Sequence, residues 1–352
     1  MMDAKKRGSE YARNKMSDHN NNQAAHPGQT SVTIACSTDD AYALPLAVML
    51  KSLAVNADPG RKIVVYIVDN QVSSQNKERI AGTVENRLNL RWCKPGGLFP
   101  NIEPEWGHVS SATYDKLFMS RLLPEDIGKA LWLDSDTLVL DDICTLFDTP
   151  MQGVNLLAVQ DPLIQKVSSP FGVQNWRNFG LSPADPYFNA GVLLVDLDKW
   201  REYDIAGSAL THVLENGKRV FFHDQEALNV ALAGKWTRLN DRWNYSANAQ
   251  HAKNQSPEHD SPSIVHFSGG LKPWVYPDLG ELQDLYFQYI DQTGWKGTRP
   301  EDSLQGKLIA WYIKSSIRKV IYPLENIRLW LRYRLRIRNN KMKSQGIIKS
   351  GK

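Results

Sequence analysis

Several features are scarce or missing in this sequence of 352 residues, and each absence excludes a class of protein. Its three cysteines, Cys36, Cys93 and Cys144, are too few for a disulfide framework and are not spaced like a zinc site. No run of about 18 apolar residues occurs, so we predict no membrane-spanning helix. The polar start of the chain predicts no signal peptide. We therefore expect a cytoplasmic protein, in which the glycosylation patterns at Asn244 and Asn254 are coincidental.

The net charge of +4 conceals an uneven distribution along the chain. From Lys307 to Lys352 there are thirteen lysines and arginines against one acid, Glu325. The remaining residues carry 29 basic and 37 acidic side chains, so an acidic body is followed by a basic tail. Such asymmetry predicts that the tail has an anionic partner of its own.

The order of apolar runs predicts an α/β fold. The run Ile63–Val68 is almost entirely apolar, as a buried parallel strand requires, and a helical pattern from Leu44 to Asn56 precedes it. Strand, helix and strand in succession form a βαβ unit. We also predict a helix over Ser111–Leu123 and a loop over Ser168–Pro186. We divide the chain into a disordered segment (1–30), one catalytic domain (31–300) and a tail (301–352).

The most informative stretch is Leu131–Leu140, in which Asp134 and Asp136 follow an apolar strand. Extended backbone places residues i and i+2 on one face, here at the carboxyl end of a strand, where open α/β sheets bind ligands. Two carboxylates that close repel each other unless a cation lies between them, and hard oxygen ligands suit Mg²⁺ or Mn²⁺. A bare Asp-x-Asp is also common in surface turns, so the motif is weak alone. Asp39, Asp40, Asp161 and Asp224 also fall at strand ends or helix starts.

A second motif surrounds His266, which ends an apolar run and precedes Gly269-Gly270 and Lys272. A single histidine in such a place is more often a packed core residue than a ligand. The two glycines allow close approach of backbone to a ligand, and Lys272 offers a charge for phosphate. An imidazole beside two aspartates favours Mn²⁺ over Mg²⁺.

These motifs resemble those of family 8 glycosyltransferases, and most of all the bacterial lipopolysaccharide galactosyl- and glucosyltransferases. The resemblance runs from about Ser31 to Trp274, roughly two thirds of the chain. The matching blocks are Ala35–Tyr42, Leu131–Leu140, Tyr187–Leu194 and His266–Trp274, together with Asp224-Gln225. It implies a GT-A fold, a Rossmann-like mixed and mainly parallel sheet flanked by helices. It also implies retaining transfer of galactose or glucose from a UDP-sugar with Mn²⁺, or Mg²⁺ as the alternative.

The resemblance also implies a role for individual residues. The metal would be held by Asp134, Asp136 and His266. The residues that it places around the transferred sugar are Asp161, Asn189, Asp224 and Gln225. Those that it places on the nucleotide and diphosphate are Thr38, Asp39, Asp40, Tyr42, Lys116, Asp134, Ser135, Ala190, Gly269 and Lys272. One position departs from the pattern: Ala41 stands where close relatives often have asparagine, which affects one uridine contact.

The charges that develop during the reaction indicate how the enzyme would catalyse it. Negative charge builds up on UDP as the sugar–phosphate bond breaks, and the metal and Lys272 would stabilise it. Retention requires either a covalent glycosyl-enzyme or attack by the acceptor on the same face. Gln225 is a poor nucleophile, so we favour same-face attack.

Two other classes of function fit parts of the sequence. Aspartate-dependent phosphatases also have Asp-x-Asp after a strand, but they have Thr or Val where this chain has Leu138. That class also leaves the His266 block unexplained. A non-catalytic module that binds sugar nucleotides or membranes is the other alternative, and the intact Asp-Asp-His set argues against it.

The basic tail predicts membrane docking. Over Gly306–Tyr322 a helical pattern puts Ile309, Ile313, Ile317 and Val320 on one face. Aromatic residues alternate with cations further along, as in interfacial membrane segments. A solvated tail or an RNA contact would have a similar composition, but we expect no nucleic-acid partner. We expect the tail to hold the enzyme on the anionic inner face of the membrane, where a glycan or glycolipid acceptor is presented.

Overall fold

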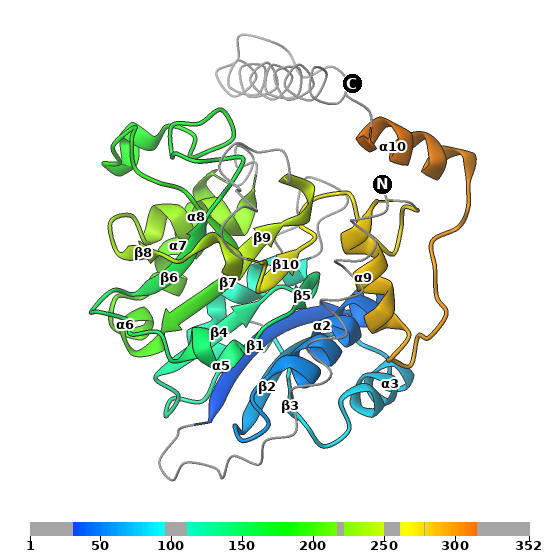
Figure 1. Ribbon diagram of the computed structural model, residues 1–352. Helices are drawn as coiled ribbons and strands as arrows, with labels where there is room; N and C mark the ends of the chain where they lie inside the picture. The colour runs from blue at the N-terminus through cyan, green and yellow to red at the C-terminus, as the bar shows by residue number, and fades with distance from the viewer. Residues whose placement is uncertain (1–30, 96–110, 217–221, 250–260, 278, 315–352) are drawn as a thin grey trace, which may run out of the picture.

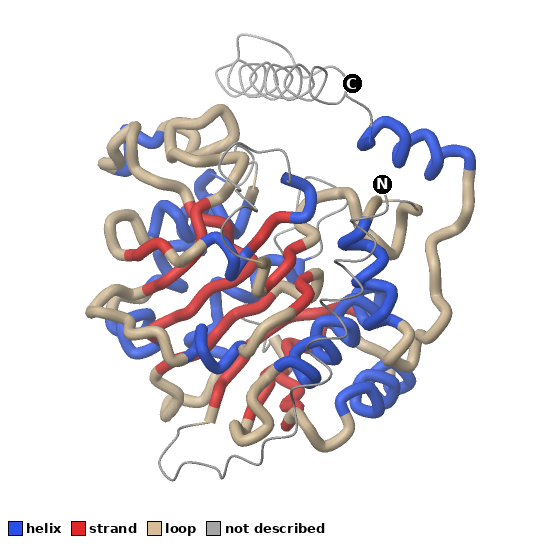
Figure 2. Tube along the Cα trace, viewed as in Figure 1, coloured by secondary structure: helices blue, strands red, loops and turns tan. Residues whose placement is uncertain are grey.

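The fold is described from a computed structural model of the protein. It describes residues 31–95, 111–216, 222–249, 261–277 and 279–314. Predictions for residues 1–30 and 315–352, and for the pattern at Asn254, lie outside these ranges. A seven-stranded sheet crosses the middle of the molecule, and a three-stranded sheet lies beside it (Figures 1 and 2). None of the helices within these ranges is long and apolar enough to cross a membrane.

Helices and strands alternate through most of these ranges. The large sheet contains β1 (Val32–Asp39), β2 (Ile63–Asn70), β3 (Asn89–Cys93), β4 (Lys129–Leu133), β6 (Leu156–Gln160), β7 (Phe188–Asp196) and β8 (Trp236–Arg238). The small sheet contains β5 (Thr137–Val139), β9 (Tyr245–Ser246) and β10 (Ile264–His266). The α-helices are α2 (Ala43–Asn56), α3 (Ser74–Val84), α4 (Met119–Leu122), α5 (Ile143–Phe147), α6 (Leu197–Glu202), α7 (Ile205–Asn216), α8 (His223–Ala231), α9 (Glu281–Ile290) and α10 (Leu304–Lys314). Short 3-10 helices are η1 (Asp40–Tyr42), η2 (Ser111–Phe118), η3 (Trp176–Phe179), η5 (Asp241–Asn244) and η6 (Ala247–Ala249).

The large sheet is mixed and mainly parallel, which confirms the predicted fold class. Its order is β3-β2-β1-β4-β7-β6-β8. Strand β1 is parallel to β2 and β4, whereas β7 is antiparallel to both β4 and β6. The amino end of β7 therefore lies at the same edge as the carboxyl ends of its neighbours. This edge is where ligands bind in open α/β sheets.

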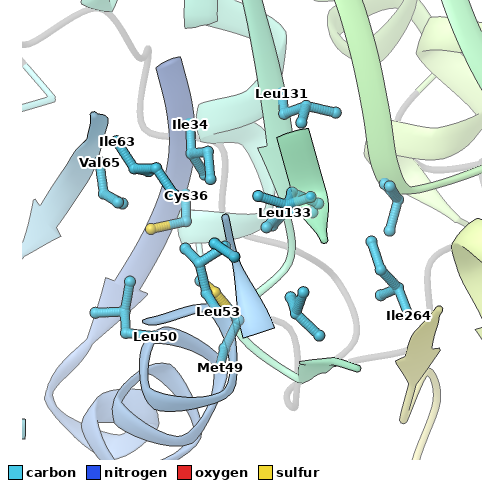
Figure 3. Packing of buried hydrophobic residues seen from close by; sticks show 14 of the residues in the cluster. Ile34, Cys36, Met49, Leu50, Leu53, Ile63, Val65, Leu131, Leu133 and Ile264 are labelled. Atoms are coloured by element: carbon cyan, nitrogen blue, oxygen red, sulfur yellow. The ribbon is translucent and has the colours of Figure 1, made fainter. Parts of the chain in front are cut away.

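Both faces of the sheet are covered in its middle, which explains why the central strands β4 and β7 are mostly apolar. In β4, Leu131 and Leu133 join the cluster that contains residues of α2, while Ala130 and Trp132 join the cluster on the opposite face. Figure 3 shows Leu131 and Leu133 in the first cluster, which also contains Met49. Successive side chains of a strand point to opposite faces, so a strand covered on both sides needs apolar residues at every position.

The small sheet has its own hydrophobic cluster. Strand β10 pairs antiparallel with β5 and parallel with β9. Leu138 of β5 and Val265 of β10 pack with Tyr286 and Ile290 of α9. This packing fixes β10, and with it His266, against the end of β4.

The predicted loop between β6 and β7 also packs on buried residues. Ile164, Val167, Val173 and Leu181 form a small cluster with Tyr187. The segment is therefore anchored close to the start of β7, although it contains only the short helix η3.

The segment predicted as one helix over Ser111–Leu123 has a different local structure. The 3-10 helix η2 covers its first eight residues, and α4 adds one turn. Every residue from Tyr114 to Phe118 is buried. An amphipathic α-helix leaves one face exposed, so contacts on all sides override the helical pattern here.

Helix α10 lies at the periphery, beyond α9 (Figure 1). Its exposed apolar residues, Leu304, Leu308 and Trp311, are spaced i, i+4 and i+7 on one face of the helix. The side chains of the face predicted from Ile309 to Val320 lie outside the described residues.

Candidate active site

The two aspartates of the Asp-x-Asp motif lie in a turn, not in an extended strand. Strand β4 ends at Leu133, and the Thr137 amide donates to the carbonyl of Asp134 over 3.2 Å. The pairing of β10 with β5 places His266 opposite Thr137. Consequently His266 Nε2 lies 3.2 Å from Asp136 Oδ1 and 3.9 Å from Asp134 Oδ2.

These three side chains fit a divalent cation. One atom from each lies within 4.8 Å of the other two, and the set of two carboxylate oxygens and one imidazole nitrogen suits Mn²⁺. Burial raises the pKa of Asp134, in spite of the neighbouring Lys116. Burial also tends to raise the pKa of Asp136, but Lys272 and His266 hold the pKa of that carboxyl well below its usual range. Asp136, the carboxylate nearest the imidazole, therefore stays ionised.

Lys116 joins Asp134 of the candidate metal site to Asp224 at the start of α8. Its ammonium lies 3.0 Å from Asp134 Oδ1 and 2.7 Å from Asp224 Oδ2, and it donates to the carbonyl of Ala190. Burial lowers the pKa of Lys116, but the two carboxylates outweigh it and raise the pKa above its ordinary value. Lys116 therefore stays charged and holds Asp224 close to Asp134.

A second cluster forms where β6, β7 and α8 meet. Asp161 Oδ2 accepts hydrogen bonds of 3.1 Å from both Asn189 Nδ2 and Gln225 Nε2. Gln225 Oε1 accepts from the amide of Ala190 over 3.0 Å. The antiparallel direction of β7 brings Asn189 and Ala190 to this edge, and the carboxylate of Asp161 is fixed by two side-chain amides.

The residues at the end of β1 that are predicted to contact the nucleotide differ in exposure and in hydrogen-bond partners. Asp39 accepts from the amide of Tyr42, and Ser135 Oγ donates to the carbonyl of Ser37 over 2.6 Å. Thr38 is buried. Asp40 is exposed and accepts from the Ser73 amide and from Asn76, so it fixes the start of α3 and does not join the acidic cluster.

Lys272, in the segment after β10, contacts the candidate metal site. Its ammonium lies 2.5 Å from Asp136 Oδ2 and donates to the carbonyl of Phe267. Gly269 has a φ of +78°, a left-handed conformation that favours glycine. Trp274 packs edge-on against Tyr42, so this segment contacts the loop after β1.

Sequence reasoning missed several polar residues in this region. Trp132 Nε1 donates to Asp134 Oδ1 over 2.7 Å, and Asn229 pairs with both backbone groups of Phe188. Asn244, which stood out only as a glycosylation pattern, is buried and contacts His266. A fully buried Asp115 accepts from Ser37 and Asn70. No motif assigns these side chains a role in the site, so only the fold reveals their places.

The fold, with an acidic site at the carboxyl edge of the sheet, is that of a GT-A glycosyltransferase. The galactosyltransferase LgtC, solved with donor and acceptor sugar analogues, superimposes with a TM-score of 0.63 at 26% identity, covering 78% of this chain and all of LgtC. The sequence profile of glycosyl transferase family 8 matches residues 33–277. The chain therefore belongs to this family, as its motifs predicted.

Curated relatives include other bacterial proteins. General stress protein A of Bacillus subtilis (strain 168) is 28% identical over 276 residues, which cover 74% of this chain and 93% of the relative. Lipopolysaccharide 1,2-glucosyltransferase of Escherichia coli (strain K12) is 26% identical over 212 residues, covering 55% of this chain and 58% of that protein.

Replacing Asp115 with asparagine is expected to stabilise the protein at neutral and alkaline pH. Burial raises the pKa of Asp115 from 3.8 to about 6, although Ser37 and Asn70 oppose the shift. As the pH rises, the unfolded chain loses this proton before the native protein does. Stability is therefore lost between about pH 4 and pH 6, by up to about 3 kcal/mol. Urea unfolding should show a gain from Asp115→Asn at about pH 8 and a smaller gain at about pH 5.

The exposed Asp126 provides the control. Asp126→Asn should change the free energy of unfolding little at either pH. Equal gains from Asp115→Asn at the two pH values would show that the buried carboxyl does not carry this penalty.

Proposed function

We propose that this glycosyltransferase transfers galactose or glucose, with retention of configuration, from a UDP-sugar to a glycan acceptor, using Mn²⁺ or Mg²⁺. The observation that carries the proposal is the convergence of two carboxylates and an imidazole beside a fixed carboxylate, Asp161. We assign the metal to Asp134, Asp136 and His266, and the transferred sugar to the Asp161 cluster.

The residues on the donor side suit a leaving diphosphate. A divalent ion held by the Asp-Asp-His set would supply positive charge beside it. Lys272 adds a second charge at the same place, where its pKa is raised by Asp136 against the effect of burial. Gly269, which has no side chain and a positive φ, lets backbone approach the phosphates closely. Negative charge that develops on UDP is thus met by groups already in position.

The residues on the sugar side suit same-face attack. Both polar atoms of the Gln225 side chain are engaged, its oxygen by Ala190 and its nitrogen by Asp161. An amide used in this way orients its neighbours and does not attack the sugar. The carboxylate of Asp161 offsets positive charge at the anomeric carbon. The acceptor hydroxyl attacks from the face that UDP leaves and gives its proton to the departing phosphate oxygen.

The product is expected to be α-linked. The enzyme should be incubated with single UDP-hexoses and Mn²⁺, UDP release followed, and the anomeric proton coupling of the product measured. A donor that releases UDP only with metal and yields an α-linkage supports the proposal. A β-linkage contradicts retention, and release from no UDP-hexose contradicts the donor class.

We further propose that residues 301–352 dock the catalytic domain (31–300) on the inner face of the membrane, where the acceptor is lipid-linked. The exposed face of α10 supports this, because Leu304, Leu308 and Trp311 can enter an interface while Lys307 remains in water. The charge of the whole tail supports it as well. Each lysine or arginine near an anionic surface contributes about 1 kcal/mol.

Removal of residues 306–352 is expected to release the enzyme from anionic vesicles without loss of donor hydrolysis. The acidic body is repelled by such a surface, so the tail must supply the attraction. Sedimentation with phosphatidylserine vesicles at low salt measures it, and neutral vesicles are the control. Equal sedimentation of the full and shortened chains would exclude the tail as an anchor.

A further inference from the structure

A continuous hydrogen-bond chain links His266 to Asp161 through two asparagines. Asn244 Oδ1 lies 2.9 Å from His266 Nδ1, and Asn244 Nδ2 donates to Asn189 Oδ1 over 2.9 Å. Asn189 Oδ1 also accepts from the Gly191 amide over 3.0 Å, and Asn189 Nδ2 donates to Asp161. The chain thus crosses from the candidate metal ligands to the carboxylate proposed to face the sugar.

The partners of Asn189 determine the direction of every bond in this chain. The backbone amide of Gly191 can only donate, and an ionised Asp161 can only accept. Asn189 must therefore turn its oxygen towards Gly191 and its nitrogen towards Asp161. It follows that Asn244 donates through its nitrogen to Asn189 and offers its oxygen to His266. His266 Nδ1 must then carry a proton, which leaves Nε2 as the atom that can bind a metal.

The side chains at the His266 end of this hydrogen-bond chain are buried. Asn244 is 2% exposed and His266 is 4% exposed, so water does not compete for these bonds. The imidazole also lies directly against β7: a Cβ at Gly191 would be 2.1 Å from His266 Cε1. The backbone on one side and Asn244 on the other leave the ring one orientation.

The elements that carry Asn244 are themselves fixed. It ends η5 and precedes β9, in which Ser246 is paired with His266 in parallel register. Arg242 of η5 is bonded to Asp141 and to Ser263 at the start of β10. The amide is therefore held at a constant distance from the imidazole.

We propose that Asn244 is a positioning residue. It holds His266 in the tautomer with the proton on Nδ1, so that Nε2 faces Asp134 and Asp136, and it couples this site to Asp161 through Asn189. The inference rests on the proposed function for the roles of metal and sugar, but the tautomer itself does not depend on that function. Partners of the second nitrogen of a metal-binding histidine commonly affect metal affinity by about 10- to 100-fold.

The first test measures Mn²⁺ binding by the full chain, with free Mn²⁺ followed by electron paramagnetic resonance. Asn244→Ala removes the acceptor and is expected to weaken binding about 10- to 100-fold. Asn244→Asp keeps an acceptor for His266 but cannot donate to Asn189. We expect it to bind Mn²⁺ within about threefold of wild type while the transfer rate at saturating Mn²⁺ is lowered about tenfold or more.

The matched control is Asn155→Ala. Asn155 is also buried, but it precedes β6 at the opposite edge of the large sheet. This variant should bind Mn²⁺ as the wild type does. Circular dichroism shows whether each variant is folded.

The second test reads the tautomer directly, without metal or donor. The chain is labelled with ¹⁵N-histidine, and the His266 signals are assigned by their loss in His266→Gln. The wild type should show a proton on Nδ1, bonded to Asn244, and in Asn244→Ala, where Asp136 is the remaining acceptor beside the ring, this proton should shift towards Nε2. An unchanged tautomer together with unchanged Mn²⁺ affinity in Asn244→Ala overturns the inference. If no UDP-sugar is a donor but Asn244→Ala shifts the tautomer, the proposed function fails and this inference stands.

Discussion

Asp136→Asn is expected to lower the rate of UDP release by about a thousandfold or more, which corresponds to roughly 4 kcal/mol of transition-state stabilisation. Asparagine keeps the shape of the side chain but removes the charge that faces both His266 and Lys272. With that charge gone, the Asp-Asp-His set loses the carboxylate nearest the imidazole. Steady-state kinetics with saturating Mn²⁺ measures the loss, and titration calorimetry measures UDP binding with and without Mn²⁺.

The calorimetry distinguishes a lost metal ligand from a general loss of folding. UDP affinity should become insensitive to Mn²⁺ in Asp136→Asn, while the exposed control Asp126→Asn keeps the wild-type response. If Asp136→Asn binds UDP in Mn²⁺ as tightly as the wild type does, Asp136 is not a metal ligand.

Lys116→Met is expected to destabilise the protein by about 3 kcal/mol, because it leaves two half-buried carboxylates without their buried cation. The Lys116 ammonium serves both Asp134 and Asp224 and is itself buried. Methionine fills a similar volume, so a cavity does not account for the loss. Urea unfolding measures the free energy, and added Mn²⁺ should restore part of it by neutralising Asp134.

Lys116→Arg is the matched comparison, because it keeps the charge but changes the shape of the cation. It should retain more of the stability than Lys116→Met. A loss under about 1 kcal/mol in Lys116→Met would show that the two aspartates do not depend on this ammonium in the folded protein.

The fold was predictable because its strands carry a strong signal. Runs such as Ile63–Val68 are almost entirely apolar, and both faces of the sheet are indeed covered. The edge of the sheet could also be predicted, since Asp134 and Asp161 follow strands that run in the same direction. The motif blocks then placed His266 in the same region, although it belongs to a separate small sheet.

Other features could not be derived from local sequence, because they depend on contacts between distant segments. The 3-10 helix at Ser111–Phe118 results from burial on all sides, which no helical pattern encodes. The turn at Asp134–Asp136 is also held from outside, because the Asp134 amide donates to Gly191 of β7 and the Phe267 amide after β10 donates to Asp136. The glycosylation pattern at Asn244 gives no sign of a contact with His266, which forms because β9 pairs with β10.

The small sheet also has a consequence for the order in which the protein folds. It joins segments that are far apart in the sequence: His266 of β10, for example, pairs with Thr137 of β5, 129 positions earlier. Contacts of such long range form late, because closing a large loop costs entropy before any contact is gained. An ion held between Asp136 and His266 would therefore find no binding site in the early folding ensemble. It would leave the rate of folding almost unchanged and act by slowing unfolding, so that metal lengthens the lifetime of the native state.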